Sequence, residues 1–196
     1  MIPLILGIIG FALYIVYDIN SFTFENRILG CSFFAGSALL VISTIMMLID
    51  AIRQKAFSGT ADILLIILSV ISFATLIYCL FFALPFDETY IEQSNGRAVY
   101  DKGAYGLCRH PGIICFFAFY LFLGLAALPS SFIVNGMLFS ALNLLYAYFQ
   151  DKVTFPKCFT NYADYRTRVP FLIPKIKRIR QAVRKQSQSD RKDDIN

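Results

Sequence analysis

The residues best placed to do chemistry in this sequence are Arg109 and His110, which stand directly before Pro111 at the start of a long apolar stretch. Proline is favoured in the first turn of a helix, because its missing N–H would have had no partner there. The triplet therefore predicts a guanidinium and an imidazole beside the free N–H groups of a helix start. Such an arrangement favours an anionic ligand. The alternative is that both side chains only extend towards lipid headgroups.

A second group of polar residues lies in the next apolar stretch. Ser140, Asn143 and Gln150 fall within about 80° of one another on a helix, with Tyr146 nearby on the same side. Polar side chains inside a membrane span usually face protein or a cavity. The alternative is that they only form hydrogen bonds between packed helices. On a regular helix Asp151 points about 100° away from Gln150.

The elements that must position these residues are apolar. The chain has 196 residues, of which 57% are hydrophobic and 16% charged, too apolar a composition for one soluble core. We therefore predict an all-α integral membrane protein, a bundle of about five transmembrane helices. Pro129-Ser130-Ser131 predicts a tight hairpin between the fourth and fifth. The predicted spans are residues 2–17, 28–49, 63–86, 113–128 and 132–149.

The first span could also be a signal peptide, but it lacks a basic start and a small-residue cleavage site, so we expect a retained helix. With five spans, 16 of the 18 lysines and arginines fall on one side of the membrane. The excess of basic residues predicts that this side is cytoplasmic, with the C-terminus inside and the N-terminus outside.

Residues 1–172 are predicted to form one transmembrane domain. Residues 173–196 form a basic amphipathic and disordered tail, which either binds anionic lipid or only sets the topology. The long loop over residues 87–110 is either a functional loop or a linker.

One histidine and no Cys-x-x-Cys pair predict no metal site, and Cys108 is expected to pack rather than react. We expect no nucleic-acid partner.

The motifs occur in an order that resembles the isoprenylcysteine carboxyl methyltransferase family and the related membrane phospholipid methyltransferases. The resemblance covers about a third of the chain and the five-span layout. The matching pieces are Arg109-His110-Pro111, Gln150-Asp151-Lys152 and FPKCFTNYADYRTRVPFLIP from Phe155 to Pro174.

This resemblance implies an integral membrane enzyme that transfers a methyl group from S-adenosylmethionine. The acceptor is lipophilic, either an isoprenylcysteine-like carboxylate or a lipid amine. Arg168 is the candidate catalytic residue, steadying an anionic acceptor. The implied cofactor-binding residues are Tyr105, Arg109, His110, Pro111, Gln150, Tyr162 and Tyr165.

The sequence departs from the family pattern at four positions, which are Ile113, Cys115, Gln150 and Thr160. The family carries an acidic residue where this chain has Gln150. These departures keep open a second hypothesis, a non-catalytic membrane protein of the same fold that binds a lipid or a protein partner. A small transporter is disfavoured, because the spans have few ionisable residues away from their ends.

Overall fold

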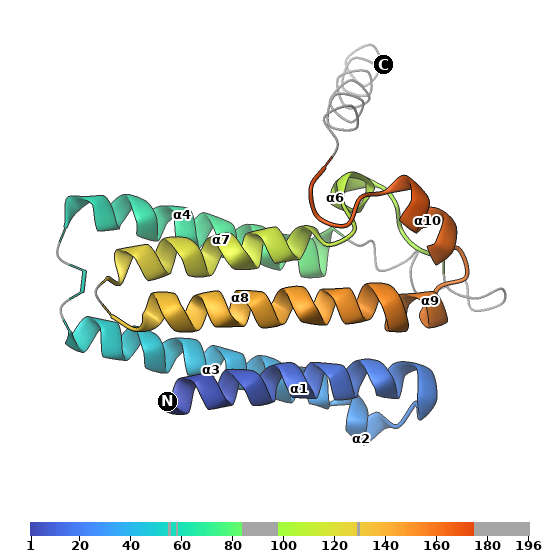
Figure 1. Ribbon diagram of the computed structural model, residues 1–196, viewed down its shortest axis with the longest axis horizontal. Coiled ribbons are helices and arrows are strands. Elements are labelled where there is room, and N and C mark those ends of the chain that lie inside the picture. Colours follow the sequence, from blue (N-terminus) through green and yellow to red (C-terminus); the bar gives the residue numbers. More distant parts are fainter. Residues whose placement is uncertain (55, 58, 84–97, 129, 175–196) are drawn as a thin grey trace, which may run out of the picture.

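The computed structural model describes residues 1–54, 56–57, 59–83, 98–128 and 130–174, and in this part of the chain every regular element is a helix. Five long helices run along the length of the molecule (Figure 1). They are α1 (Ile2–Thr23), α3 (Ser32–Arg53), α4 (Thr60–Ile77), α7 (Pro111–Ala126) and α8 (Phe132–Phe149). A π-helical turn extends α4 as η1 (Tyr78–Phe82), and another extends α8 as η2 (Gln150–Thr154).

Four of these segments are long and apolar enough to cross a membrane. They are Ile2–Thr23, Arg27–Arg53, Thr60–Phe82 and Phe132–Cys158, whereas α7 is apolar but has only 16 residues. Large apolar side chains also cover the outer surface, as at Leu64, Val70 and Leu145, which are at least 60% exposed. A helical bundle with this surface indicates a membrane protein.

The first helix is longer than the sequence predicted. The predicted span ended at residue 17, before the polar residues Asp18 and Asn20, but α1 continues to Thr23 and buries both. Asn20 closes the connection that follows: its side-chain amide donates to the Asn26 carbonyl and its oxygen accepts from the Asn26 N–H, both at 2.9 Å. Hydrogen bonds from a polar side chain therefore hold the connection that follows α1.

The helices form two closely packed pairs, α1 with α3 and α4 with α7, and α8 packs against both α7 and α1. Figure 1 shows α8 lying between the two pairs. Glycines let α1 and α3 approach closely, since a Cβ on Gly36 would lie 2.7 Å from the Gly10 carbonyl oxygen. Small residues at a helix crossing are typical of membrane bundles.

Aromatic side chains fill the space between the helices. Phe11 of α1, Tyr120 of α7 and Phe139 of α8 are each less than 5% exposed. The Tyr120 hydroxyl finds a partner in Thr44 Oγ1 of α3, 2.6 Å away. This hydrogen bond satisfies a buried polar group and ties α3 to α7.

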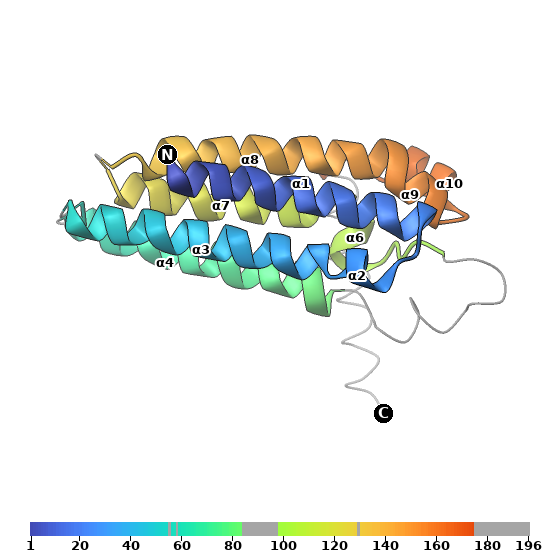
Figure 2. The ribbon, with the colours of Figure 1, turned by 90° about the horizontal axis from the view of Figure 1, so that it is seen from below.

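The short helices gather at one end of the bundle, which we call the polar end (Figures 1 and 2). They are α2 (Arg27–Gly30), α6 (Gly103–Leu107), α9 (Phe155–Cys158) and α10 (Tyr162–Arg168). The start of α7 and the turn η2 lie at the same end, so the polar end holds the residues that the sequence singled out. Residues 87–97 of the predicted loop over residues 87–110, and the tail from residue 175, lie outside the described residues.

Candidate functional site

Two motifs that are about 60 residues apart in the sequence meet at the polar end. The Arg109 N–H donates to the Pro170 carbonyl at 2.9 Å, and the His110 N–H donates to the Phe171 carbonyl at 3.2 Å. Pro111 then begins α7 at its first position, as its fixed φ favours. The backbone itself therefore joins the Arg-His-Pro triplet to the segment after α10.

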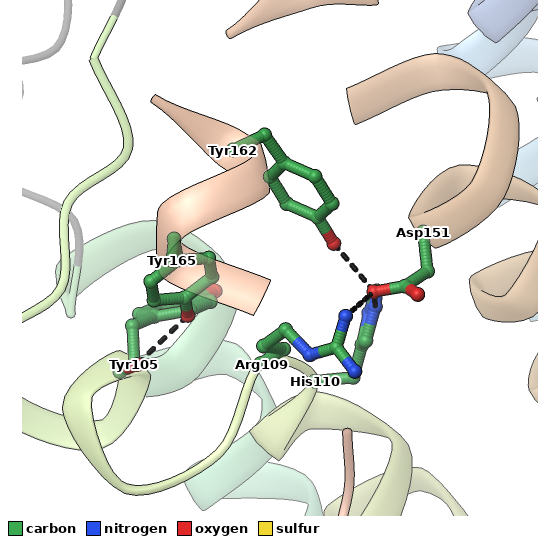
Figure 3. A network of polar contacts seen from close by, with 6 residues as sticks. All are labelled: Tyr105, Arg109, His110, Asp151, Tyr162 and Tyr165. Atoms are coloured by element: carbon green, nitrogen blue, oxygen red, sulfur yellow. Dashed lines mark hydrogen bonds and ion pairs between the residues drawn. The ribbon is translucent and has the colours of Figure 1, made fainter. Parts of the chain in front are cut away.

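The side chains converge on the carboxylate of Asp151 (Figure 3). Arg109 Nη1 forms an ion pair with Asp151 Oδ1, and the Tyr162 hydroxyl donates to the same oxygen at 2.5 Å. His110 Nε2 lies 3.8 Å from this oxygen. The side chains of Arg109, His110 and Asp151 are at most 10% exposed, and Tyr162 is 2% exposed. The interaction therefore takes place largely away from solvent. We call Arg109, His110, Asp151 and Tyr162 the Asp151 cluster.

Asp151 lies in the π-helical turn η2, directly after α8. The Phe155 N–H bonds to the Gln150 carbonyl, five residues back, so η2 holds one more residue than a regular helical turn. Asp151 lies on a different face from Gln150, as a regular helix also predicts, but the face that meets Arg109 and Tyr162 is that of Asp151. Gln150, which the sequence placed with Arg109 and His110, instead lies beside Asp18 of α1 and donates to the Tyr146 hydroxyl at 2.9 Å.

Aromatic rings enclose the histidine and the arginine. The His110 ring stacks on Phe155, with centroids 5.7 Å apart and planes 13° apart, and meets the edge of Phe171 at 4.9 Å. The Arg109 guanidinium carbon lies 5.5 Å from the centroid of the Phe171 ring. Both phenylalanines belong to the segment from Phe155 to Pro174, so this segment supplies the walls of the cluster.

Two nitrogens of the Asp151 cluster are buried and unsatisfied. Arg109 Nε and His110 Nε2 have no hydrogen-bond partner among the described residues. An unsatisfied buried polar group costs about 1–3 kcal/mol, and native proteins contain few of them. The cluster therefore has hydrogen-bonding capacity for a polar ligand that carries acceptor oxygens.

Tyr162 stays protonated at neutral pH. Burial and then the neighbouring Asp151 carboxylate raise the pKa of its phenol above the usual value.

Two further tyrosines connect the elements beside the cluster (Figure 3). The Tyr165 hydroxyl donates to the Tyr105 carbonyl at 2.8 Å, and the Tyr105 hydroxyl donates to the Cys79 carbonyl in η1 at 2.9 Å. Tyr105 and Tyr165 thus hold α6, α10 and η1 together.

Two residues considered from the sequence lie apart from the chemistry. Arg168 pairs with Asp101 at 2.7 Å on the surface, with its side chain 51% exposed, and has no described contact with the Asp151 cluster. Cys108 is 3% exposed, and burial raises the pKa of its thiol. A buried, protonated thiol is a poor nucleophile, which agrees with the expectation that Cys108 packs.

A half-open hollow lies next to the cluster, on α9 and α10. Its volume is about 390 Å³, and Tyr162 contributes to its wall while reaching Asp151 with its hydroxyl. The other lining residues are Pro156, Phe159, Thr160, Ala163, Arg166 and Thr167. Small-molecule sites occupy about 300–1,000 Å³, so the hollow has the size of a small binding site.

The sequence pointed to most of this site but missed some of its residues. Phe155 and Phe171 lay inside the matched motif without being assigned a role. Asp151 was set aside because Gln150 holds the position that matches the family motif, and Asp151 lies on a different face of the helix. Asp18 carried the clearest unused signal, since it is an acid within an apolar helix.

Comparison of the chain with protein-family models, with curated proteins and with solved structures gave no match. Among the described residues, no group of three or more His, Cys, Asp and Glu side chains could hold a metal ion. The function therefore has to be argued from the Asp151 cluster and its surroundings.

Proposed function

We propose that this chain is an integral membrane methyltransferase that uses S-adenosylmethionine to methylate a lipophilic acceptor. The acceptor is either the carboxylate of an isoprenylcysteine-like compound or a lipid amine. The proposal includes five membrane crossings, with α7 and α8 as a tight hairpin, the N-terminus outside and the polar end in the cytoplasm.

The observation that carries the proposal is the pair of unsatisfied donors, Arg109 Nε and His110 Nε2, within a buried cluster. The cofactor has a carboxylate whose oxygens could accept from both nitrogens. It also carries a sulfonium, which the Asp151 carboxylate and the rings of Phe155 and Phe171 suit by charge and by cation–π attraction. The residues present therefore fit this cofactor.

Asp151 gives this fit a second support. The resembling family carries an acidic residue at the end of the second hairpin helix, where this chain has Gln150. The next residue, Asp151 in η2, lies beside Arg109 and His110 instead. A negative charge is therefore present beside the histidine, although one position later in the sequence.

The hollow on α9 and α10 offers room for the rest of the cofactor. Tyr162 belongs to both sites, since it lines the hollow and its hydroxyl donates to Asp151. Phe159 provides an apolar wall there, and Arg166 provides hydrogen-bond donors. We propose that the nucleoside lies in this hollow and the amino-acid end at the cluster.

The five-crossing topology rests on length and charge. α7 has 16 residues and is about 24 Å long, somewhat less than the roughly 30 Å of a hydrocarbon core. Local thinning of the bilayer and extension of flanking polar side chains to its surface accommodate such a difference at modest cost. Described basic residues also concentrate at the polar end, as Arg27, Lys102, Lys157 and Arg166, as the positive-inside rule requires of a cytoplasmic side.

The cofactor supplies an activated methyl group, and the protein has to align the acceptor in line with it and exclude water. Burial of the Asp151 cluster serves the second requirement. A carboxylate acceptor is already ionised, whereas an amine acceptor has to lose a proton first. Tyr162 remains protonated, so it orients Asp151 by donating a hydrogen bond and does not act as a base.

The direct test is transfer of a labelled methyl group in lipid nanodiscs. Purified protein is incubated with methyl-labelled S-adenosylmethionine and either a prenylated cysteine or a phosphatidylethanolamine, and lipid products are analysed by mass spectrometry. The proposal predicts one labelled acceptor class with the wild type and none with His110→Ala. Label in neither class, under conditions where the cofactor binds, would exclude both proposed acceptors.

One observation favours the alternative, a non-catalytic membrane protein that binds a lipid or a protein partner. Arg109 Nη1 is already paired with Asp151, which reduces the positive charge available to an anionic ligand. The two functions differ in cofactor binding, because only the methyltransferase requires it.

A further inference from the structure

A second buried carboxylate contacts the same turn that carries Asp151. Asp18 of α1 is only 3% exposed, although it belongs to an apolar helix. Thr154 Oγ1 donates to Asp18 Oδ2 at 3.3 Å, and the side chains of Gln150 and Tyr146 also interact with this carboxylate. Asp18 thus lies against both the first and the last residue of η2.

The partners of Asp18 are neutral. The ion pairs found among the described residues involve Asp151 and Asp101, and none involves Asp18. Burying a carboxylate costs free energy unless hydrogen bonds compensate for the lost water. The Asp18 carboxylate, which forms no ion pair among the described residues, therefore needs the hydrogen-bond donors of η2 and α8. This need constrains where those donors lie.

This constraint fixes the orientation of η2. Gln150 and Thr154 are four residues apart, so they share a face of the helical segment, whereas Asp151 lies on a neighbouring face. Holding the first face against α1 determines where the second face points. Thr154 is itself 4% exposed, so the contact is shielded from competing water.

The end of α1 also contacts the helix that follows η2. Ser21 Oγ lies 3.8 Å from Cys158 Sγ, and Lys157 Nζ lies 4.1 Å from the centroid of the Phe22 ring. Asp18, Ser21 and Phe22 therefore form a continuous support along η2 and α9. Phe155, which stacks on His110, lies within the supported segment.

We infer that Asp18 is a positioning residue, which orients η2 so that Asp151 faces Arg109 and His110. This inference rests on the proposed function only where it concerns the cofactor, since the orientation of η2 can be measured without any ligand. Asp18 is assigned no contact with substrate or cofactor.

The ligand-free test compares Asp18→Asn with the wild type in nanodiscs by hydrogen exchange and by alkylation of Cys158. Asn keeps the size of the side chain but replaces one acceptor oxygen with a donor that meets the donors of η2. We expect exchange over residues 150–158 and alkylation of Cys158 to become about tenfold faster. Asp50→Asn is the matched control, because Asp50 is exposed near the C-terminal end of α3, away from the polar end.

The location of the change separates positioning from general destabilisation. Faster exchange confined to residues 150–158 and to α10, with α3 and α4 unchanged, agrees with the inference. Unchanged exchange over residues 150–158, or an equal increase in all helices, would overturn it.

The ligand arm measures S-adenosylmethionine affinity in the same variants. Asp18→Asn should weaken binding about tenfold, and Asp50→Asn should leave it unchanged. Equal affinity of Asp18→Asn and the wild type would also overturn the inference. If the wild type itself does not bind, the proposed function fails, and the exchange result alone decides the role of Asp18.

Discussion

At the scale of single residues, Asp151 determines how the polar end is held together. Its Oδ1 atom accepts from both Arg109 and Tyr162, and His110 lies 3.8 Å away. Removing one partner of a buried ion pair leaves the other charge without compensation, which is far more costly than losing a surface pair. The cluster is therefore expected to contribute to stability as well as to binding.

Asp151→Ala should lower the free energy of unfolding by about 3 kcal/mol, because it leaves the Arg109 guanidinium buried and unpaired. Asp101→Ala is the matched control. It breaks the exposed Arg168–Asp101 pair and should cost less than about 1 kcal/mol. Denaturant unfolding in detergent micelles measures both. Equal losses in the two variants would contradict the burial argument.

Deprotonation of Tyr105 is expected to lower the stability of the protein at alkaline pH. Burial raises the pKa of its phenol from 10.0 to about 12, so its contribution to stability is complete below pH 10 and is lost as the pH rises through 12. The thermal midpoint should therefore fall over this range. Tyr105→Phe should make the fall shallower, and an unchanged slope would show that Tyr105 is not its source.

At the scale of elements, two local features position the site. The turn η2 carries Asp151 beside the residues that precede α7, and α1, which packs closely on α3, contacts η2. The α1–α3 crossing depends on glycine, since a Cβ at Gly36 would approach the Gly10 carbonyl oxygen to 2.7 Å. Backbone atoms cannot move aside as a flexible side chain can.

Gly36→Ala should destabilise the protein by about 1–3 kcal/mol, because the added methyl group forces α1 and α3 apart. Gly30→Ala is its control, since a Cβ there meets no atom within 4 Å. That change should stay within about 0.5 kcal/mol of the wild type. Thermal unfolding of both variants in the same detergent gives the comparison, and a harmless Gly36→Ala would exclude the close crossing.

The sequence could predict the helices but not the turn that completes the site. Apolar runs located the ends of the long helices, with η1 taken as part of α4, to within six residues, because apolar length is the main determinant of a membrane helix. Nothing in Gln150-Asp151-Lys152 signals a π-helical turn. Residues of the turn contact Asp18 and Arg109, which are distant in the sequence, and no local pattern encodes such contacts.

At the scale of the whole molecule, the short helices, the Asp151 cluster and most described basic residues are found at the same end, the polar end (Figures 1 and 2). Positive charge near apolar spans is retained on the cytoplasmic side. The polar end should therefore face the cytoplasm.

Cysteine labelling in intact cells tests this orientation. A cysteine introduced at Arg166, at the polar end, should resist a membrane-impermeant maleimide until the membrane is opened. A cysteine at Arg53, at the end of α3, should react without opening. The reverse pattern would contradict the proposed orientation.

Isothermal titration calorimetry of S-adenosylmethionine into the nanodisc-embedded protein tests the central claim most directly. The account predicts micromolar binding that His110→Ala abolishes and that Arg53→Ala, a charge removed at the opposite end, leaves intact. No binding by the wild type, or equal binding by wild type and His110→Ala, would contradict a cofactor site at the Asp151 cluster.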